Sequence, residues 1–251
     1  MAERDERPRP GGSVRGLLRN ADAPGPSLWI PNAVSLVVAT LLACSAVLGL
    51  AGLAGAHFDR ALENFTGDPV TVAERDGCPS AGCGVVGFAS NLGALTWAAA
   101  AIICLFVALA LRLGARHPAR RSPYLYFGIL TGVLVLDDVF LFHETRWPFE
   151  AWLGESHVYA GYTLLALVIV VSFRAFLART SVWILGLAVG FFGLSLVADV
   201  LSRDILGVDR HLPEDGAKLI GIALWALFFI GTAAVEVGRA ISAPATEPAD
   251  V

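Results

Sequence analysis

The chain has 251 residues, of which 56% are hydrophobic and only 16% are charged, and its formal net charge is −4. Soluble globular domains carry about 25% charged residues, so this composition excludes an ordinary soluble domain and indicates an integral membrane protein.

The chain begins with 30 residues that are charged and rich in proline and glycine. This composition predicts a disordered cytoplasmic tail rather than a secretory signal. Six apolar segments follow, each near the length of about 20 residues that a helix needs to cross a bilayer. We place them at 32–55, 91–113, 124–143, 157–178, 182–202 and 217–237. The predicted fold is an all-α, polytopic bundle of six transmembrane helices over residues 31–238, with a second cytoplasmic tail over 239–251.

The arginines indicate the orientation of the spans. Five precede the first span, and others follow the second and fourth spans: Arg116, Arg120, Arg121, Arg174 and Arg179. Basic residues in short loops stay in the cytoplasm. Both termini are therefore predicted to be cytoplasmic, in a multi-pass protein of the plasma membrane. The extracytoplasmic segments are then 57–90, 144–156 and 203–216.

Two cysteines lie in the predicted extracytoplasmic loop 57–90. Cys78 and Cys83 are in the polar stretch ERDGCPSAGCG, where an oxidising environment favours a disulfide bond. A zinc site formed by this pair alone would lack ligands. Cys44 and Cys104 fall within spans and are expected to be small apolar core residues.

Other residues of the spans are expected to form the scaffold. Glycines let transmembrane helices approach closely, and we expect such contacts at Gly49, Gly52, Gly55, Gly186 and Gly190. Trp147, Trp152, Tyr159 and Tyr162 are typical of an aromatic belt at the outer membrane surface.

The third span contains the stretch VLVLDDVFLFHE, which places Asp137 and Asp138 among apolar residues. A charged side chain within a membrane costs about 2.5 kcal/mol or more, so such residues normally face the bundle interior and have partners. A purely structural polar contact, or acids kept neutral by a raised pKa, would also explain one such residue. Two adjacent acids point in different directions around the helix, so one structural partner cannot easily serve both. The pair therefore favours a functional site.

Candidate partners lie at the same depth on two other spans. Asp199 is near the outer end of the fifth span, and Glu214 and Lys218 begin the sixth. Lysine is a compact ammonium whose pKa shifts readily, and Lys218 is the single lysine among the 18 basic residues. We predict that Asp137 or Asp138, Asp199, Glu214 and Lys218 form one charge cluster. A local Glu214–Lys218 helical pair is the alternative.

Three classes of function remain open. In the first, a metal-dependent hydrolase acts on a lipid or lipid-linked substrate, and a divalent metal such as zinc activates a water molecule. Its catalytic residues are expected to be Asp138, Asp199, Glu214 and Lys218, and its metal ligands are drawn from Asp137, Asp138, His143, Glu144, Asp199 and His211.

The second class is a proton- or cation-coupled transporter, and the third is a non-catalytic scaffold or sensor. A transport pathway across the membrane needs polar groups on both sides of the membrane midplane. The cytoplasmic halves offer little beyond Asn32, Ser35, Thr131 and Ser172, which favours a one-sided pocket. The expected partners are the lipid bilayer and a lipid substrate or small ion, without nucleic acid.

Overall fold

The structure is a computed structural model that describes residues 27–58, 63–67, 69, 72–73, 86–113, 118–140, 155–201 and 211–242. Its six long helices are α2 (Ala33–Phe58), α5 (Phe88–Leu113), α6 (Pro118–Phe140), α7 (Glu155–Ser172), α9 (Val182–Leu201) and α10 (His211–Ser242). Two four-residue helices accompany them, α3 (Glu63–Thr66) and α8 (Arg174–Leu177). Each predicted apolar segment corresponds to one long helix.

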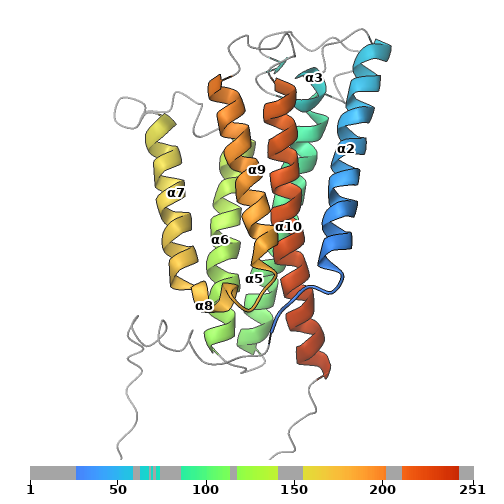
Figure 1. Ribbon diagram of the computed structural model, residues 1–251. Helices are drawn as coiled ribbons and strands as arrows, with labels where there is room; N and C mark the ends of the chain where they lie inside the picture. The colour runs from blue at the N-terminus through green and yellow to red at the C-terminus, as the bar shows by residue number, and fades with distance from the viewer. Residues whose placement is uncertain are drawn as a thin grey trace, which may run out of the picture.

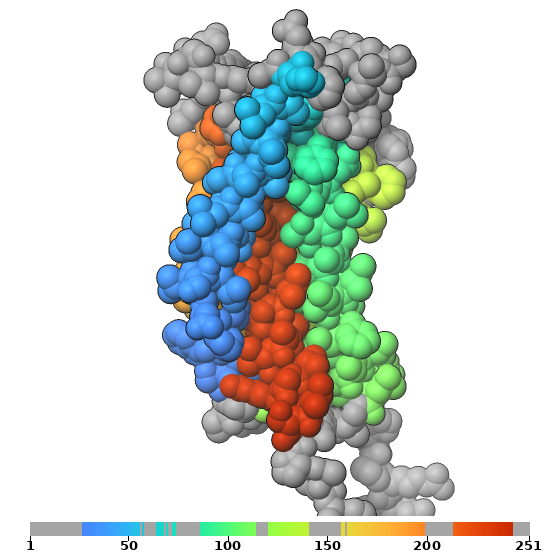
Figure 2. Space-filling model, turned by 90° about the vertical axis from the view of Figure 1, so that its right-hand side faces the viewer, coloured from blue at the N-terminus to red at the C-terminus, as the bar shows by residue number. Residues whose placement is uncertain are grey.

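The long helices lie side by side and alternate in direction along the chain (Figure 1). The central helix is α10, against which α2, α5 and α9 all pack. Figure 2 shows α2 running obliquely across α10, with α5 on the other side of α10. The α6 helix packs on α5, and α7 lies at the edge of the bundle beyond α6.

Four helices in the described part of the chain are long and apolar enough to cross a membrane: Ala33–Gly55, Phe88–Leu113, Arg120–Phe140 and Pro213–Ser242. The α7 and α9 helices contain shorter apolar stretches, Ala160–Ser172 and Val182–Ala198. Large apolar side chains such as Leu95, Ile102, Phe106 and Leu164 are exposed on the outside of the bundle. A soluble monomer rarely exposes an apolar surface of this extent. The bundle is therefore suited to a lipid bilayer, while six crossings remain a prediction.

Close helix contact occurs at glycines other than the predicted ones. A Cβ atom on Gly221 would lie 2.8 Å from Cε1 of Phe192 and 3.2 Å from the carbonyl oxygen of Ala188, so α9 and α10 meet closely there. By contrast, Gly49, Gly52, Gly186 and Gly190 have nothing within 4 Å of such an atom. The prediction for these four was wrong, because open space rather than another helix adjoins them.

The segment before α2 packs against one end of the bundle. The backbone N–H of Leu28 donates a hydrogen bond to the carbonyl oxygen of Arg179 at 2.7 Å, and that of Ile30 donates to Oγ of Ser181 at 3.0 Å. The Ile30 side chain fits against Gly231 of α10. The last residues of the expected tail are thus folded, and residues 1–26 lie outside the described part.

Candidate functional site

Side chains of α6 and α10 meet in a regular series across the bundle. The pairs are Arg120–Glu236, Tyr124–Thr232, Phe127–Phe229, Thr131–Trp225 and Asp138–Lys218. Each step forward along α6 is matched by an equal step backward along α10, so the two helices are antiparallel and in constant register. We call this series the α6–α10 seam.

The seam has an ion pair at each end. Arg120 and Asp138 are 18 residues apart on α6, which corresponds to about 27 Å along a helix. The hydrocarbon core of a bilayer is about 30 Å thick. The two ion pairs therefore lie near opposite boundaries of one membrane thickness.

The Asp138–Lys218 pair occupies the end of the seam where α6 finishes and α10 starts. Lys218 Nζ lies 2.5 Å from Oδ1 of Asp138, and the side chain of Asp138 is only 8% exposed whereas that of Lys218 is 41% exposed. Asp137 is also buried and shares a side-chain hydrogen bond with Tyr162 of α7. Two adjacent buried carboxylates are thus held by residues of two different helices.

Acidic residues predominate at this end of the bundle. The first turns of α10 add Glu214 and Asp215 to Asp137 and Asp138. Among the Lys, Arg, Asp and Glu side chains described at this end, Lys218 is the single basic one. Fixed negative charge in a low-dielectric surrounding raises the local concentration of cations, so this end of the bundle attracts positive ions.

An aromatic layer separates the two ends of the seam. The ring centroids of Phe127 and Phe229 are 5.0 Å apart, and those of Trp225 and Phe229 are 5.1 Å apart. The indole N–H of Trp225 donates a hydrogen bond to Oγ1 of the fully buried Thr131 at 3.1 Å. These packed side chains separate the Asp138–Lys218 pair from the Arg120–Glu236 pair along the seam.

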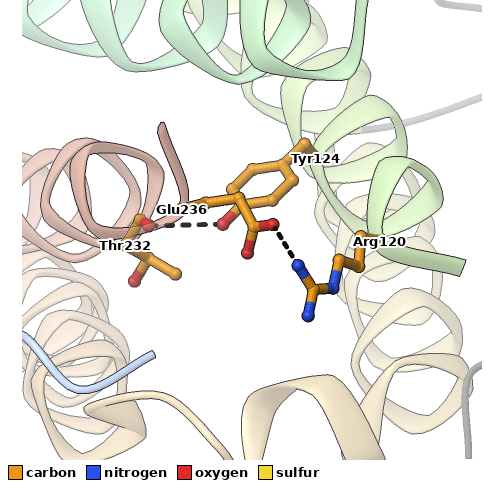
Figure 3. Close-up of polar contacts among 4 residues, drawn as sticks. All are labelled: Arg120, Tyr124, Thr232 and Glu236. Atoms are coloured by element: carbon orange, nitrogen blue, oxygen red, sulfur yellow. Dashed lines mark hydrogen bonds and ion pairs between the residues drawn. The ribbon is translucent and has the colours of Figure 1, made fainter. Parts of the chain in front are cut away.

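The other end of the seam carries a second polar cluster (Figure 3). Arg120 Nη1 lies 3.2 Å from Oε1 of Glu236, whose side chain is 2% exposed. One turn further along α6, the hydroxyl of Tyr124 donates to the carbonyl oxygen of Thr232 at 3.3 Å. These four residues line the interior where α6 begins and α10 approaches its end.

This cluster was not predicted from the sequence, and its polar contacts contradict the expectation of few polar groups at the end predicted to be cytoplasmic. The α6 helix begins at Pro118, six residues before the predicted span, and α10 continues to Ser242. Proline suits the first turn of a helix because the N–H it lacks has no intrahelical partner there. That preference was the available signal that Arg120 belongs to the same helix as Tyr124 rather than to the preceding loop.

The structure brings some of the predicted site residues together. Asp138 meets Lys218, Asp137 lies beside them, and Glu214 is one turn before Lys218 on α10. His143 and Glu144 lie outside the described residues, as do Cys78 and Cys83, and only the backbone is described for Asp199 and His211. The roles assigned to these residues, and the Cys78–Cys83 disulfide, remain predictions. Cys44 and Cys104 are buried and free.

A metal centre finds no support in the described part of the chain. Where side chains are described, no group of three His, Cys, Asp or Glu residues is placed to hold a metal ion. Asp137 and Asp138 alone supply too few ligands for a closed zinc site, which takes four.

Comparison with known proteins gives a family but no activity. A family model described as "Domain of unknown function (DUF8692)" matches residues 33–232. No curated protein and no solved structure matches the chain. The matched region runs from the start of α2 to Thr232, so it contains the Asp138–Lys218 pair and most of the α6–α10 seam.

Proposed function

We propose that this chain, which belongs to the family described as a domain of unknown function (DUF8692), is a multi-pass membrane transporter that exchanges a small cation for a proton. The exchange site is formed by Asp137, Asp138 and Lys218. The charges and contacts of these three residues support the exchange.

One observation carries the proposal, namely that two adjacent buried carboxylates lie beside a single ammonium group. Lys218 neutralises Asp138 directly, and Tyr162 supplies a neutral hydrogen bond to Asp137. A hydrogen bond stabilises a buried carboxylate but does not cancel its charge. Beside the ammonium, the two neighbouring carboxylates can therefore hold either a shared proton or a monovalent cation.

The exposure of Lys218 gives the site a way to exchange charge. A cation that binds both carboxylates competes with the ammonium for Asp138. Since the Lys218 side chain is 41% exposed, it can turn toward water as an ammonium when a cation displaces it. The proton that leaves is one that the two neighbouring carboxylates share. Lysine is suited to this step because its ammonium is a compact charge on a flexible stem, whereas arginine holds a carboxylate in a rigid fork. One cation enters the site and one proton leaves, so the charge is conserved.

The seam offers a link between binding and movement. The Asp138–Lys218 pair joins α6 to α10 at one end of the seam. When a cation displaces Lys218, this connection is lost while the Arg120–Glu236 pair at the other end remains. A transporter needs such a change at one end without the same change at the other, because the two sides must open alternately.

The proposed orientation has six crossings and both termini in the cytoplasm. Arginines gather at the end of the bundle that carries Arg120, and acids gather at the end that carries Asp138. The positive-inside rule favours the arginine-rich end as cytoplasmic. The exchange site then opens to the extracytoplasmic side, which is the plasma-membrane topology expected from the sequence.

The test uses the purified full chain in liposomes that contain a pH-sensitive dye. Addition of NaCl or KCl outside should change the internal pH, and Asp138→Asn and Lys218→Met should each abolish the change. Ser45→Ala is the matched control, because the Ser45 hydroxyl is exposed and bonds only to Leu41 O of its own helix. Unchanged activity in Asp138→Asn, or no ion-dependent proton movement by the wild-type chain, would refute the proposal.

The same preparation also tests the hydrolase hypothesis. Elemental analysis should find no stoichiometric zinc, manganese or iron. A bound metal that is lost in Asp138→Ala would instead favour a metal-dependent pocket completed by residues such as His143 and His211.

A further inference from the structure

The polar cluster at the arginine-rich end of the seam contains hydrogen-bonding capacity that the protein itself does not use. Thr232 is 1% exposed, and its Oγ1 has no hydrogen-bond partner. Nη1 of Arg239 is buried and also has no partner. A buried polar atom without a hydrogen bond is unfavourable, so two such atoms in one cluster are available to bind a group from outside the chain.

Both atoms belong to one site. Arg239 is one turn beyond Glu236 on α10, and Thr232 is one turn before it. The charges of Glu236, Arg120 and Arg239 all act on the hydroxyl of Tyr124, which itself bonds to the backbone of Thr232. Thr232, Tyr124 and Arg120 lie around Glu236 (Figure 3), and Arg239 is close enough for its charge to act on Tyr124.

The charges of the cluster select an anion. Glu236 pairs with Arg120, and among the described residues no ion pair joins Arg239 to an acid, so the three charged side chains leave one positive charge unbalanced. The unused groups are an N–H of Arg239 and the hydroxyl of Thr232, both of which can donate hydrogen bonds. Guanidinium groups bind phosphate through paired hydrogen bonds. An oxygen-rich anion with a single negative charge fits these donors and this charge.

The position of the cluster identifies the source of the anion. Arg120 is 36% exposed, so the cluster reaches the surface of the bundle near one membrane boundary. The described arginines at this end are Arg112, Arg120, Arg121, Arg174, Arg179 and Arg239. Basic pockets between transmembrane helices on the cytoplasmic side bind the headgroups of anionic lipids.

We infer that Arg120, Tyr124, Thr232 and Arg239 form a binding site for the phosphate group of an anionic phospholipid. The phosphate accepts hydrogen bonds from Nη1 of Arg239 and Oγ1 of Thr232. The Glu236 carboxylate holds Arg120 in position beside it. The site lies at the opposite end of the seam from Asp138, and it does not depend on cation exchange there.

The test measures thermal unfolding of the purified full chain by tryptophan fluorescence in mild detergent. Added phosphatidylglycerol should raise the unfolding midpoint, and phosphatidylcholine should not. Arg239→Gln should weaken the apparent affinity for phosphatidylglycerol about tenfold, the effect of one hydrogen bond to a charged group. Thr232→Val removes the hydroxyl while keeping the side-chain shape, and it should weaken the affinity several-fold.

Arg112→Gln is the matched control, because Arg112 is an exposed arginine at the end of α5. Its removal changes the net charge equally and should leave the affinity almost unchanged. Equal losses in Arg112→Gln and Arg239→Gln would show nonspecific attraction and overturn the inference. An equal stabilisation by inorganic phosphate would overturn the assignment to a lipid. Each variant is first shown to unfold cooperatively without lipid, and if Arg239→Gln does not fold, Thr232→Val decides.

Discussion

Removal of either partner from the Asp138–Lys218 pair should have unequal effects on stability. Lys218→Met leaves a carboxylate that is 8% exposed and has lost its countercharge. A buried charge left alone costs about 3–5 kcal/mol, and the partial exposure of Lys218 indicates that some water reaches the pair. We therefore expect a loss of about 2–3 kcal/mol in the free energy of unfolding.

Asp138→Asn should cost less than Lys218→Met. The remaining ammonium is on a long side chain that is 41% exposed and can turn toward water. We expect a loss of about 1 kcal/mol, as is typical of an exposed ion pair. In the double variant, the second substitution removes a group that the first has already left unpaired. The loss in the free energy of unfolding should therefore be about 2 kcal/mol smaller than the sum of the two single losses.

The assay is reversible unfolding of the purified chain in mixed micelles, with increasing fractions of a denaturing detergent and tryptophan fluorescence as the signal. All four proteins of the double-mutant cycle are measured at one pH and one salt concentration. Additive losses would show that the two side chains do not interact, and a larger loss for Asp138→Asn than for Lys218→Met would refute the reasoning from exposure.

Three further predictions concern other parts of the bundle. Arg120→Met should cost about 3 kcal/mol in unfolding free energy, more than Lys218→Met, because Glu236 is only 2% exposed; equal losses in the same micelle assay would contradict this order. Gly221→Leu should cost about 2 kcal/mol because the new side chain meets Phe192 and the Ala188 carbonyl, while Gly186→Leu, with open space around it, should change stability by less than about 0.5 kcal/mol. A reporter enzyme fused after Val251 should behave as a cytoplasmic protein, and its export would invert the proposed orientation.

The helices could be predicted from the sequence because the bilayer restricts the choices. An apolar segment in lipid must satisfy its own backbone hydrogen bonds, and only a helix does so within one segment. The six predicted segments consequently match α2, α5, α6, α7, α9 and α10. The cost of a lone carboxylate in an apolar surrounding also required a partner for Asp138, and the structure supplies Lys218.

The arginine-rich cluster could not be found in the same way. Hydropathy ends a predicted span where charges appear, so Arg120 and Arg239 were assigned to loops or tails. In the structure they lie within α6 and α10. The position of Arg120 is stable there because Glu236 neutralises it across the bundle. That compensation depends on the register between α6 and α10, so it cannot be predicted from either segment of the sequence alone.

The side chains of the α6–α10 seam show how this register is maintained. Three of the four polar pairs combine a long side chain with a shorter group: Lys218 with Asp138, Trp225 with Thr131, and Tyr124 with the backbone at Thr232. The long member comes from α10 in the first two pairs and from α6 in the third. In the fourth pair, Arg120 and Glu236 are both long side chains. A slip of one residue between the helices would misalign all four pairs at once. Between these pairs, the rings of Phe127 and Phe229 fill the same gap without polar groups. The contacts of the seam that lie between the two ion pairs therefore hold them at a fixed separation. Loss of one ion pair loosens one end of the bundle, while these contacts keep the other end aligned.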